Sequence, residues 1–555
     1  NGKINEYKLD SKGIFDEKLT GNYNNRKFTL SNVKEGAVIE FVYSIKTDRT
    51  TFFREWEFQG KYPVMWSEYT ARIPEYFFYK LEMQGYNPFA INEKKDGIEQ
   101  YMIRQSSSQG NHASAASISA RTTDYPWVMK DVPAFSDDKF ITTKVDYISK
   151  IKFQLQGYQY PQSAYHGVLN TWEKVTEAIY NTDGFASSMN RTGFLKDQIK
   201  AIADKYPDPT SRSVAVASFL KNNVKWNGDN DFIASQTPKT VFDKKTGSAA
   251  DINLLLVGML REAGLEANPI LLSTRKHGRV NEYYPMVGNF NYVIAAVRLD
   301  STDLLLDATD AHRPSYLLPE RCLNGKGRLI NQKSEGRWVS LQNNAIKAKK
   351  LSVASLAVKD GKLAGSLVVY SKDYEAANMR SAVAAASSED EFFKKAFKTN
   401  GLTVTKHAFE NLKNIDTTLV TNVSFEAEDE INNSSVVYVN PVMFGSFSEN
   451  VFKAKDRKYP VSFPTTMEDT YMATIDIPEG YVVDELPKSA RFDLSEGGGK
   501  FTFTNGQVGR KIQLRTTVGF NKTMFLPEEY EGLKSFYAAI IAKQSEQIVF
   551  KKANQ

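Results

Sequence analysis

The chain is organised around one segment, Lys244-Lys-Thr-Gly-Ser-Ala-Ala-Asp-Ile-Asn-Leu-Leu-Leu-Val-Gly-Met-Leu-Arg-Glu-Ala-Gly264. Gly247 ends a turn, an apolar run follows from Ile252 to Leu260, and Gly264 closes the segment. With Asp251 in its first turn and a glycine at its end, the segment predicts an α-helix. Because the run is apolar on nearly all sides, we expect this helix to be buried at the centre of a domain.

Three short apolar segments after the helix predict strands. They are Pro269-Ile-Leu-Leu-Ser-Thr274, Phe290-Asn-Tyr-Val-Ile-Ala-Ala-Val-Arg-Leu299 and Asp303-Leu-Leu-Leu-Asp-Ala-Thr309. The last two are joined by Asp300-Ser-Thr-Asp303, which is typical of a hairpin turn. The sequence therefore predicts a central helix that leads into an antiparallel sheet.

This arrangement, over about residues 210 to 320, resembles the transglutaminase-like core of the papain-like superfamily. In that family a Gly-x-Cys-x-Asp element opens the helix, a histidine lies on the next long strand, and an aspartate lies on the neighbouring strand. The Leu-Leu-Asp-Ala-Thr ending at Thr309 is part of the resemblance. The resemblance implies an α+β fold with a Cys-His-Asp triad at the start of the helix.

Two of the three triad positions depart from the family pattern. When the Gly-x-Cys-x-Asp element of the family is aligned with Gly247-Ser-Ala-Ala-Asp251, its cysteine falls on Ala249. Laid on Phe290-Asn-Tyr-Val293, the histidine falls on Tyr292, and only the acidic member is kept, as Asp307. Alanine has no nucleophile, and a tyrosine with a pKa of about 10 is a poor base near neutral pH. We therefore expect no catalytic residue at these positions and a degenerate cleft.

The remaining candidates belong to the same cleft. The resemblance places Trp226 and Ser248 beside it, and Asn291 precedes the tyrosine. A buried carboxylate needs hydrogen-bond donors, so we expect Asp307 to accept from backbone N–H groups, Asn291 or the Tyr292 hydroxyl. A serine hydrolase built on Ser248 would need a base, and no histidine occupies the matching strand position.

Composition limits the other kinds of site. The net charge of +6 is small for 555 residues, and no basic tract is interleaved with aromatic residues, so we expect no nucleic-acid partner. Cys322 is the single cysteine and is expected to be a structural thiol. The five histidines do not stand at metal-ligand spacing, so we expect neither a metal nor a cofactor. No apolar run approaches the ~18 residues of a membrane helix.

The period of the apolar pattern divides the chain into four predicted regions. Residues 1–160 alternate with a period of two and predict a β-sandwich-like domain, whereas residues 161–344 carry helical stripes and the transglutaminase-like core. Residues 345–449 predict a β-rich domain with one helix, and residues 450–555 predict a β domain with a terminal helix. The fold class is therefore α+β and multidomain.

Segments such as Phe28–Glu40 in the first region and Tyr459–Phe463 in the last resemble the β domains that flank this core in a bacterial family of unassigned function. That resemblance implies a protein of the bacterial cell envelope, periplasmic or at the cell surface, with its signal peptide absent from this chain. Two functions remain open. The first is a non-catalytic binding or scaffolding module, with a protein, peptide or glycan partner in the degenerate cleft or on the β domains. The second is a peptidase, amidase or acyltransferase that uses unconventional residues.

Overall fold

The computed structural model describes residues 5–20, 23–31, 33–45, 53–105, 114–136, 138–168, 171–331, 336–343, 345–359, 362–398, 401–430, 435–445 and 447–553. The chain divides into two compact units, Asn1–Thr51 and Phe52–Gln555. This division lies inside the predicted N-terminal region of residues 1–160, and the three predicted boundaries between the four regions remain predictions.

The first unit contains one antiparallel hairpin, formed by β1 (Ile14–Thr20) and β2 (Tyr23–Phe28). The alternating pattern of Ile39, Phe41 and Tyr43 predicts a strand, but residues 33–45 adopt no regular strand. These three side chains are at least half exposed, at 50%, 61% and 62%. A strand is stable only beside a hydrogen-bonded neighbour, and within the described residues no strand pairs with this segment.

The second unit begins with two antiparallel sheets that share one core. The first sheet contains β3 (Trp56–Glu57), β5 (Phe77–Gln84), β9 (Lys150–Tyr158) and β10 (His166–Gly167). The second contains β4 (Val64–Pro74), β6 (Ile91–Asn92), β7 (Lys95–Gln105) and β8 (Ser114–Val132). Ile73 of β4, Trp127 of β8 and Phe153 of β9 lie in one buried cluster, so the inner faces pack against each other as in a sandwich.

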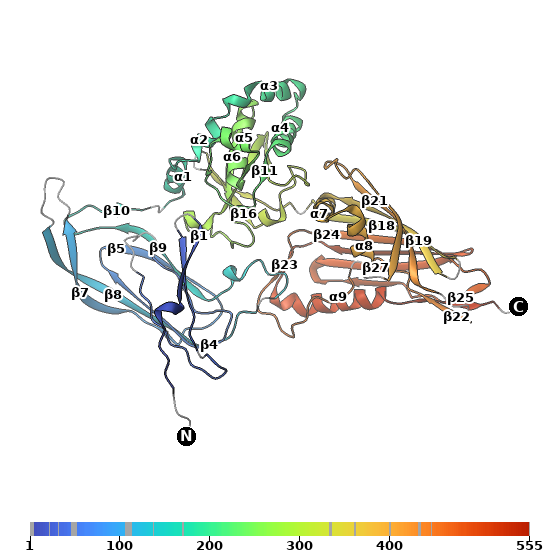
Figure 1. Cartoon of the computed structure of the whole chain (residues 1–555), viewed down its shortest axis with the longest axis horizontal. Helices are drawn as coiled ribbons and strands as arrows, with labels where there is room; N and C mark the ends of the chain where they lie inside the picture. Colours follow the sequence, from blue (N-terminus) through green and yellow to red (C-terminus); the bar gives the residue numbers. More distant parts are fainter. Residues whose placement is uncertain are drawn as a thin grey trace. The chain divides into compact units, whose positions relative to one another are not determined.

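The helical region follows. Its helices are α1 (Trp172–Tyr180), α2 (Ala186–Asn190), α3 (Lys196–Lys205), α4 (Pro209–Asn223), α5 (Pro238–Lys244) and α6 (Ala249–Glu262). The predicted central helix is α6, and every residue from Ala249 to Leu260 is buried. In Figure 1, α1 to α5 lie around α6. Such burial explains why the segment is apolar on all sides.

An antiparallel five-stranded sheet packs on α6 in the order β15-β14-β13-β16-β17. Its strands are β13 (Ala267–Leu272), β14 (Tyr292–Leu299), β15 (Thr302–Leu306), β16 (Lys326–Leu329) and β17 (Arg337–Ser340). Leu271 and Val293 belong to the core that contains α6, whereas Ile270 and Tyr292 belong to a second core on the other face. Both faces of the sheet are therefore partly covered.

The last part of the chain forms an eight-stranded sheet in the order β20-β21-β19-β18-β24-β28-β27-β26. Its strands are β18 (Ala348–Lys359), β19 (Lys362–Lys372), β20 (Leu402–Glu410), β21 (Leu419–Glu430), β24 (Met467–Asp476), β26 (Ala490–Asp493), β27 (Gly499–Val508) and β28 (Lys511–Phe520). Helices α7 (Asp373–Ala385) and α8 (Glu389–Lys398) come between β19 and β20 in the sequence. Helix α9 (Tyr530–Gln544) follows the last strand of the sheet in the sequence and lies beside the sheet in Figure 1.

Smaller strand pairs complete this part. They are β22 (Val436–Val439) and β25 (Tyr481–Glu485), both paired with β30 (Ile548–Lys552), and β23 (Val461–Ser462) paired with β29 (Met524–Phe525). The observed architecture confirms the predicted fold class, a multidomain α+β protein in which strand-rich parts flank a helical core. Among the described residues, no helix is both long enough and apolar enough to cross a membrane.

Candidate functional site

The start of α6 is built by a reciprocal cap. The Ser248 hydroxyl accepts a hydrogen bond from the backbone N–H of Asp251 at 3.2 Å, and the Asp251 carboxylate accepts one from the N–H of Ser248 at 3.0 Å. Asp251 also accepts from the N–H groups of Ser235 and Gln236. Ser248 is only 6% exposed, so its hydroxyl serves the helix terminus rather than a solvent-filled cleft.

Ala249, onto which the sequence resemblance lays the cysteine of the family, follows the cap. Its side chain is fully buried and lies in the same apolar cluster as Tyr292 and Cys322. Its backbone N–H donates to the carbonyl of Asp229 at 3.0 Å. A methyl group here offers neither a nucleophile nor a donor.

Tyr292 is the first residue of β14, and its side chain contacts Asp307. Its hydroxyl donates a hydrogen bond to Asp307 at 2.9 Å, and both side chains are buried. Burial and the negative charge of Asp307 raise the pKa of Tyr292 well above its ordinary value. The tyrosine therefore stays protonated near neutral pH and acts as a donor, not as a base.

Asp307 has further partners that saturate its two oxygens. The Asn253 amide donates to it at 2.9 Å, and the backbone N–H of Thr309 donates at 2.9 Å. The hydroxyl of Thr309 donates as well. Asn253 is held in turn, because its amide also donates to the Val293 carbonyl and its oxygen accepts from the N–H of Ala308. Donors on both oxygens satisfy the hydrogen-bonding capacity of this buried carboxylate.

Arg321 covers this network from a short 3-10 turn, Glu320–Cys322. One terminal nitrogen of its guanidinium donates to the Tyr292 hydroxyl at 3.0 Å and also to the hydroxyl of Thr309. The guanidinium stacks on Trp226, with 4.1 Å between its central carbon and the ring centroid. The indole N–H of Trp226 donates to the Asp229 carbonyl. The Tyr292 hydroxyl thus accepts a hydrogen bond from the Arg321 guanidinium and donates one to the buried carboxylate of Asp307.

Cys322, next to Arg321, is fully buried in the cluster that contains Ala249 and Tyr292. The sequence places this thiol well past the helix, but the fold brings it back to the site. Burial raises its pKa, with Asp307 acting in the same direction, so the sulfur remains a neutral thiol near neutral pH.

Asn291 points away from the acid. Its amide oxygen accepts from the N–H of Thr274 at 2.8 Å, and its nitrogen donates to the hydroxyl of the same residue. Of the donors that the sequence suggests for Asp307, the structure supplies the Tyr292 hydroxyl and a backbone N–H but not Asn291. The donors that were missed are Asn253 and the Thr309 hydroxyl. The one polar residue in the apolar run Ile252–Leu260 is Asn253, and that exception is a usable signal.

Among the described residues, His277 is the histidine that contacts a buried hydroxyl, and that hydroxyl does not belong to Ser248. His277 Nδ1 lies 2.9 Å from the hydroxyl of Ser273, which is only 2% exposed, and burial together with Lys152 lowers the pKa of His277. Ser248 keeps its capping role instead of pairing with a histidine. In the described part of the chain, no three His, Cys, Asp or Glu side chains gather as metal ligands would.

Comparisons with known proteins bear on the family and the fold of this region. Residues 196–304 match the Transglutaminase-like superfamily, and residues 435–550 match a domain of unknown function with a solved structure, DUF3858. A search of curated proteins gives no match.

Two solved structures are similar. One, a "putative protease" from Parabacteroides distasonis, aligns with 90% of this chain and 74% of its own at 13% identity and a TM-score of 0.52. The other, a "putative cysteine protease" from Cytophaga hutchinsonii, aligns with 44% of this chain and 75% of its own at 13% identity, but its TM-score of 0.18 is too low to bear on the fold. The first alignment supports the fold, and the family match identifies residues 196–304 as a transglutaminase-like domain, in a chain that flanks this domain with strand-rich parts.

Proposed function

We propose that this chain is a non-catalytic transglutaminase-like protein that acts as a binding or scaffolding module of the bacterial cell envelope. The observation that carries the proposal is the pair Ala249 and Tyr292, at the positions of nucleophile and base. A cysteine at a helix N-terminus is activated because the helix dipole and an imidazolium stabilise its thiolate. Ala249 has no sulfur and Tyr292 has no imidazole.

The surroundings support the same conclusion. Asp307 would orient the histidine of an active relative, whereas here its oxygens accept from Asn253, Tyr292 and Thr309. Ala249 and Tyr292 are fully buried and Asp307 is 2% exposed, so a substrate carbonyl has no access to the three positions. Their side chains serve packing and hydrogen bonding.

The catalytic half of the proposal is tested by assaying the full chain with generic peptide and glutamine substrates. We expect no amidase or transamidase turnover above a heat-denatured control, and no change in Cys322→Ser or Ser248→Ala. Turnover that either substitution abolishes would establish an enzyme with an unconventional nucleophile and would overturn the proposal.

The binding half is tested by affinity capture of partners with tagged full chain from the native envelope fraction. We expect a partner to be retained equally by the native protein and by Cys322→Ser, because the buried thiol takes no part in binding. A partner lost only with Cys322→Ser would assign this thiol a function that the proposal denies.

A further inference from the structure

A second feature of the central domain lies away from Ala249, where the five-stranded sheet curls on itself. Asp303 on β15 forms an ion pair with Arg298 on β14 at 3.4 Å and another with Arg337 on β17. β15 and β17 are the two edge strands. In a flat sheet these edges would be about 19 Å apart, further than an arginine reaches, so the sheet closes around its concave face.

The curled face carries a half-open hollow of about 470 Å³. Its wall consists of two carboxylates, two guanidiniums, two amides and a small apolar floor: Glu266, Asn268, Ala296, Arg298, Asp303, Leu329, Asn331, Gly336 and Arg337. The volume falls within the roughly 300–1,000 Å³ of small-molecule sites.

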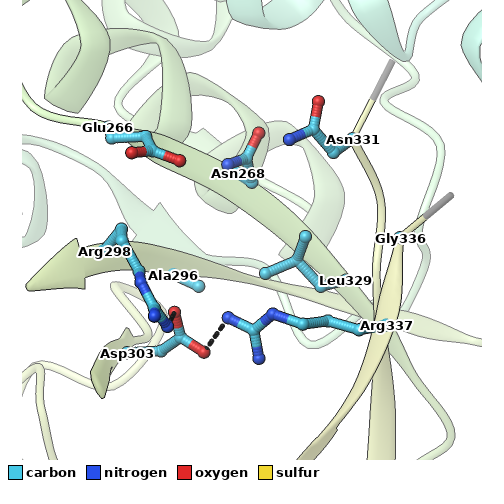
Figure 2. Close-up of a pocket in the computed structure, with 9 residues that line it drawn as sticks. All are labelled: Glu266, Asn268, Ala296, Arg298, Asp303, Leu329, Asn331, Gly336 and Arg337. Atoms are coloured by element: carbon cyan, nitrogen blue, oxygen red, sulfur yellow. Dashed lines mark hydrogen bonds and ion pairs between the residues drawn. The ribbon is translucent and has the colours of Figure 1, made fainter. Parts of the chain in front are cut away.

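The charged groups lie on two sides of the hollow. Figure 2 shows Glu266, Asn268 and Asn331 along one side, while Arg298 and Arg337 converge on Asp303 at the other. The Asp303 side chain is 8% exposed, whereas those of Arg298 and Arg337 are 39% and 45% exposed. The carboxylate is thus the buried anchor, and the guanidiniums keep N–H donors available to the hollow.

The balance of charge differs between the two sides. Two guanidiniums around Asp303 leave an excess of one positive charge. Glu266 supplies a negative charge opposite, and among the described residues its carboxylate has no hydrogen-bond or ion-pair partner. A simple anion would be repelled by Glu266, and a simple cation by the guanidiniums.

We propose that this hollow binds a small zwitterion of the amino-acid or short-peptide class. The carboxylate of the ligand pairs with Arg298 and Arg337, since guanidinium groups match carboxylates in a bidentate manner. The ammonium group pairs with Glu266, and the Asn268 amide faces the peptide bond. The inference goes beyond the proposed function, because the hollow does not include Ala249, Tyr292 or Asp307.

The test measures binding of L-alanyl-L-alanine to the full chain by calorimetry, with N-acetyl-alanyl-alanine and alanyl-alanine amide as matched probes. We expect saturable binding of the free dipeptide and binding about tenfold or more weaker for each blocked probe, because each lacks one charge-assisted contact. Equal binding of the acetylated probe would mean an anion site and would overturn the zwitterion proposal.

Variants locate the binding. Glu266→Gln leaves the fold intact because Glu266 is exposed, and we expect it to weaken dipeptide binding about tenfold or more. Arg337→Gln should weaken binding as well, but it also loosens the edge of the sheet. Glu262→Gln, an exposed glutamate of α6 outside the hollow, is the control and should bind as the native chain does. Unchanged binding by Glu266→Gln, or no saturable binding by the native chain, would overturn the proposal. The ion pairs of Asp303 would then only join the two edge strands of the sheet.

Discussion

Asp307 is the residue on which the buried network of the central domain depends. Its carboxyl group is removed from water, and the donors of Asn253, Tyr292 and Thr309 replace the lost hydrogen bonds to water. Removing the carboxylate leaves these donors buried and unpaired, and each unpaired group costs about 1–3 kcal/mol.

We therefore expect Asp307→Ala to lower the free energy of unfolding by roughly 3 kcal/mol, without any catalytic effect to measure. Urea denaturation followed by tryptophan fluorescence gives this value. Asp204→Ala, which removes an exposed ion pair with Lys200 on α3, is the control and should change stability by less than about 0.5 kcal/mol. Equal effects of the two substitutions would show that the network contributes nothing.

The thiol of Cys322 gives a second prediction at this scale. Because burial raises its pKa and shields the sulfur, iodoacetamide should label native protein very slowly at both pH 7 and pH 9. In urea the thiol regains a pKa of about 8.5, so labelling should become fast and should rise steeply over the same pH range. Mass spectrometry of the intact chain measures both rates, and fast, pH-dependent labelling of native protein would contradict the burial.

The residues of the site were predictable from the sequence to different degrees. The contact of Tyr292 with Asp307 follows from their places on strands joined by a short hairpin. The Arg321 and Cys322 contacts do not, because a loop far along the chain brings them across the sheet face and no spacing rule encodes that return. An arginine that stacks on Trp226 has no local signal in the sequence.

At the scale of single elements, α4 carries a lysine in an unusual place. Lys221 is 6% exposed, its ammonium group donates to the Arg313 carbonyl, and burial lowers its pKa to about 8. An unfolded lysine has a pKa of about 10.4, so between about pH 8 and pH 10 the unfolded chain binds more protons than the folded chain. Stability from this group therefore rises with pH across that window, and below it the folded state carries the penalty.

Lys221→Met removes this dependence. The free energy of unfolding of the variant, minus that of the native chain, should be larger at pH 7 than at pH 10. We expect this difference to fall by about 3 kcal/mol between the two pH values. Urea denaturation of both proteins at the two pH values measures it, and groups common to both proteins cancel. A difference that does not change with pH would mean that Lys221 stays charged when buried.

Helix α7 holds a loop through one guanidinium. Arg380 is 2% exposed and donates to five backbone carbonyls of the loop between β20 and β21, those of Asn411, Leu412, Asn414, Ile415 and Thr417. Such bonds to a charged donor contribute about 1.5–3 kcal/mol each at most, and they fix the loop more than they stabilise the whole fold.

Arg380→Ala should free this loop. We expect a lysine-specific protease to cut after Lys413 about tenfold faster or more in the variant, because local opening no longer breaks those bonds. Arg491→Ala, which removes only an exposed ion pair with Asp493, should leave the rate unchanged. The same rate in all three proteins would show that other contacts hold the loop.

At the scale of the whole molecule, the alternation of apolar residues shows which segments form strands more reliably than it shows which strands pair with each other. The apolar alternation of Thr418–Ala427 and Val436–Val439 predicts strands, and the structure has β21 and β22 there. The sequence also predicts a helix near residues 389–399, which is α8. The Asp360-Gly361 pair predicts a hairpin turn; it lies outside the described residues, although β18 and β19 pair on either side of it. Partners are harder to predict, because pairing depends on segments far apart in sequence.

The regions 345–449 and 450–555 show this most clearly, because β18 pairs in parallel with β24 from Ala348↔Met467 to Leu356↔Ile475. Phe425 of β21 and Phe501 of β27 lie in one buried core, so we propose that the two regions unfold as one unit. Phe501→Ala removes a fully buried ring and should cost about 3–5 kcal/mol. Hydrogen exchange should then quicken in β19 and β21 as much as in β24 and β28, whereas Lys500→Ala, exposed on the same strand, should change neither pair. Faster exchange confined to β24 and β28 would instead support separate domains divided at residue 449, because a core that is truly shared cannot be weakened on one side alone.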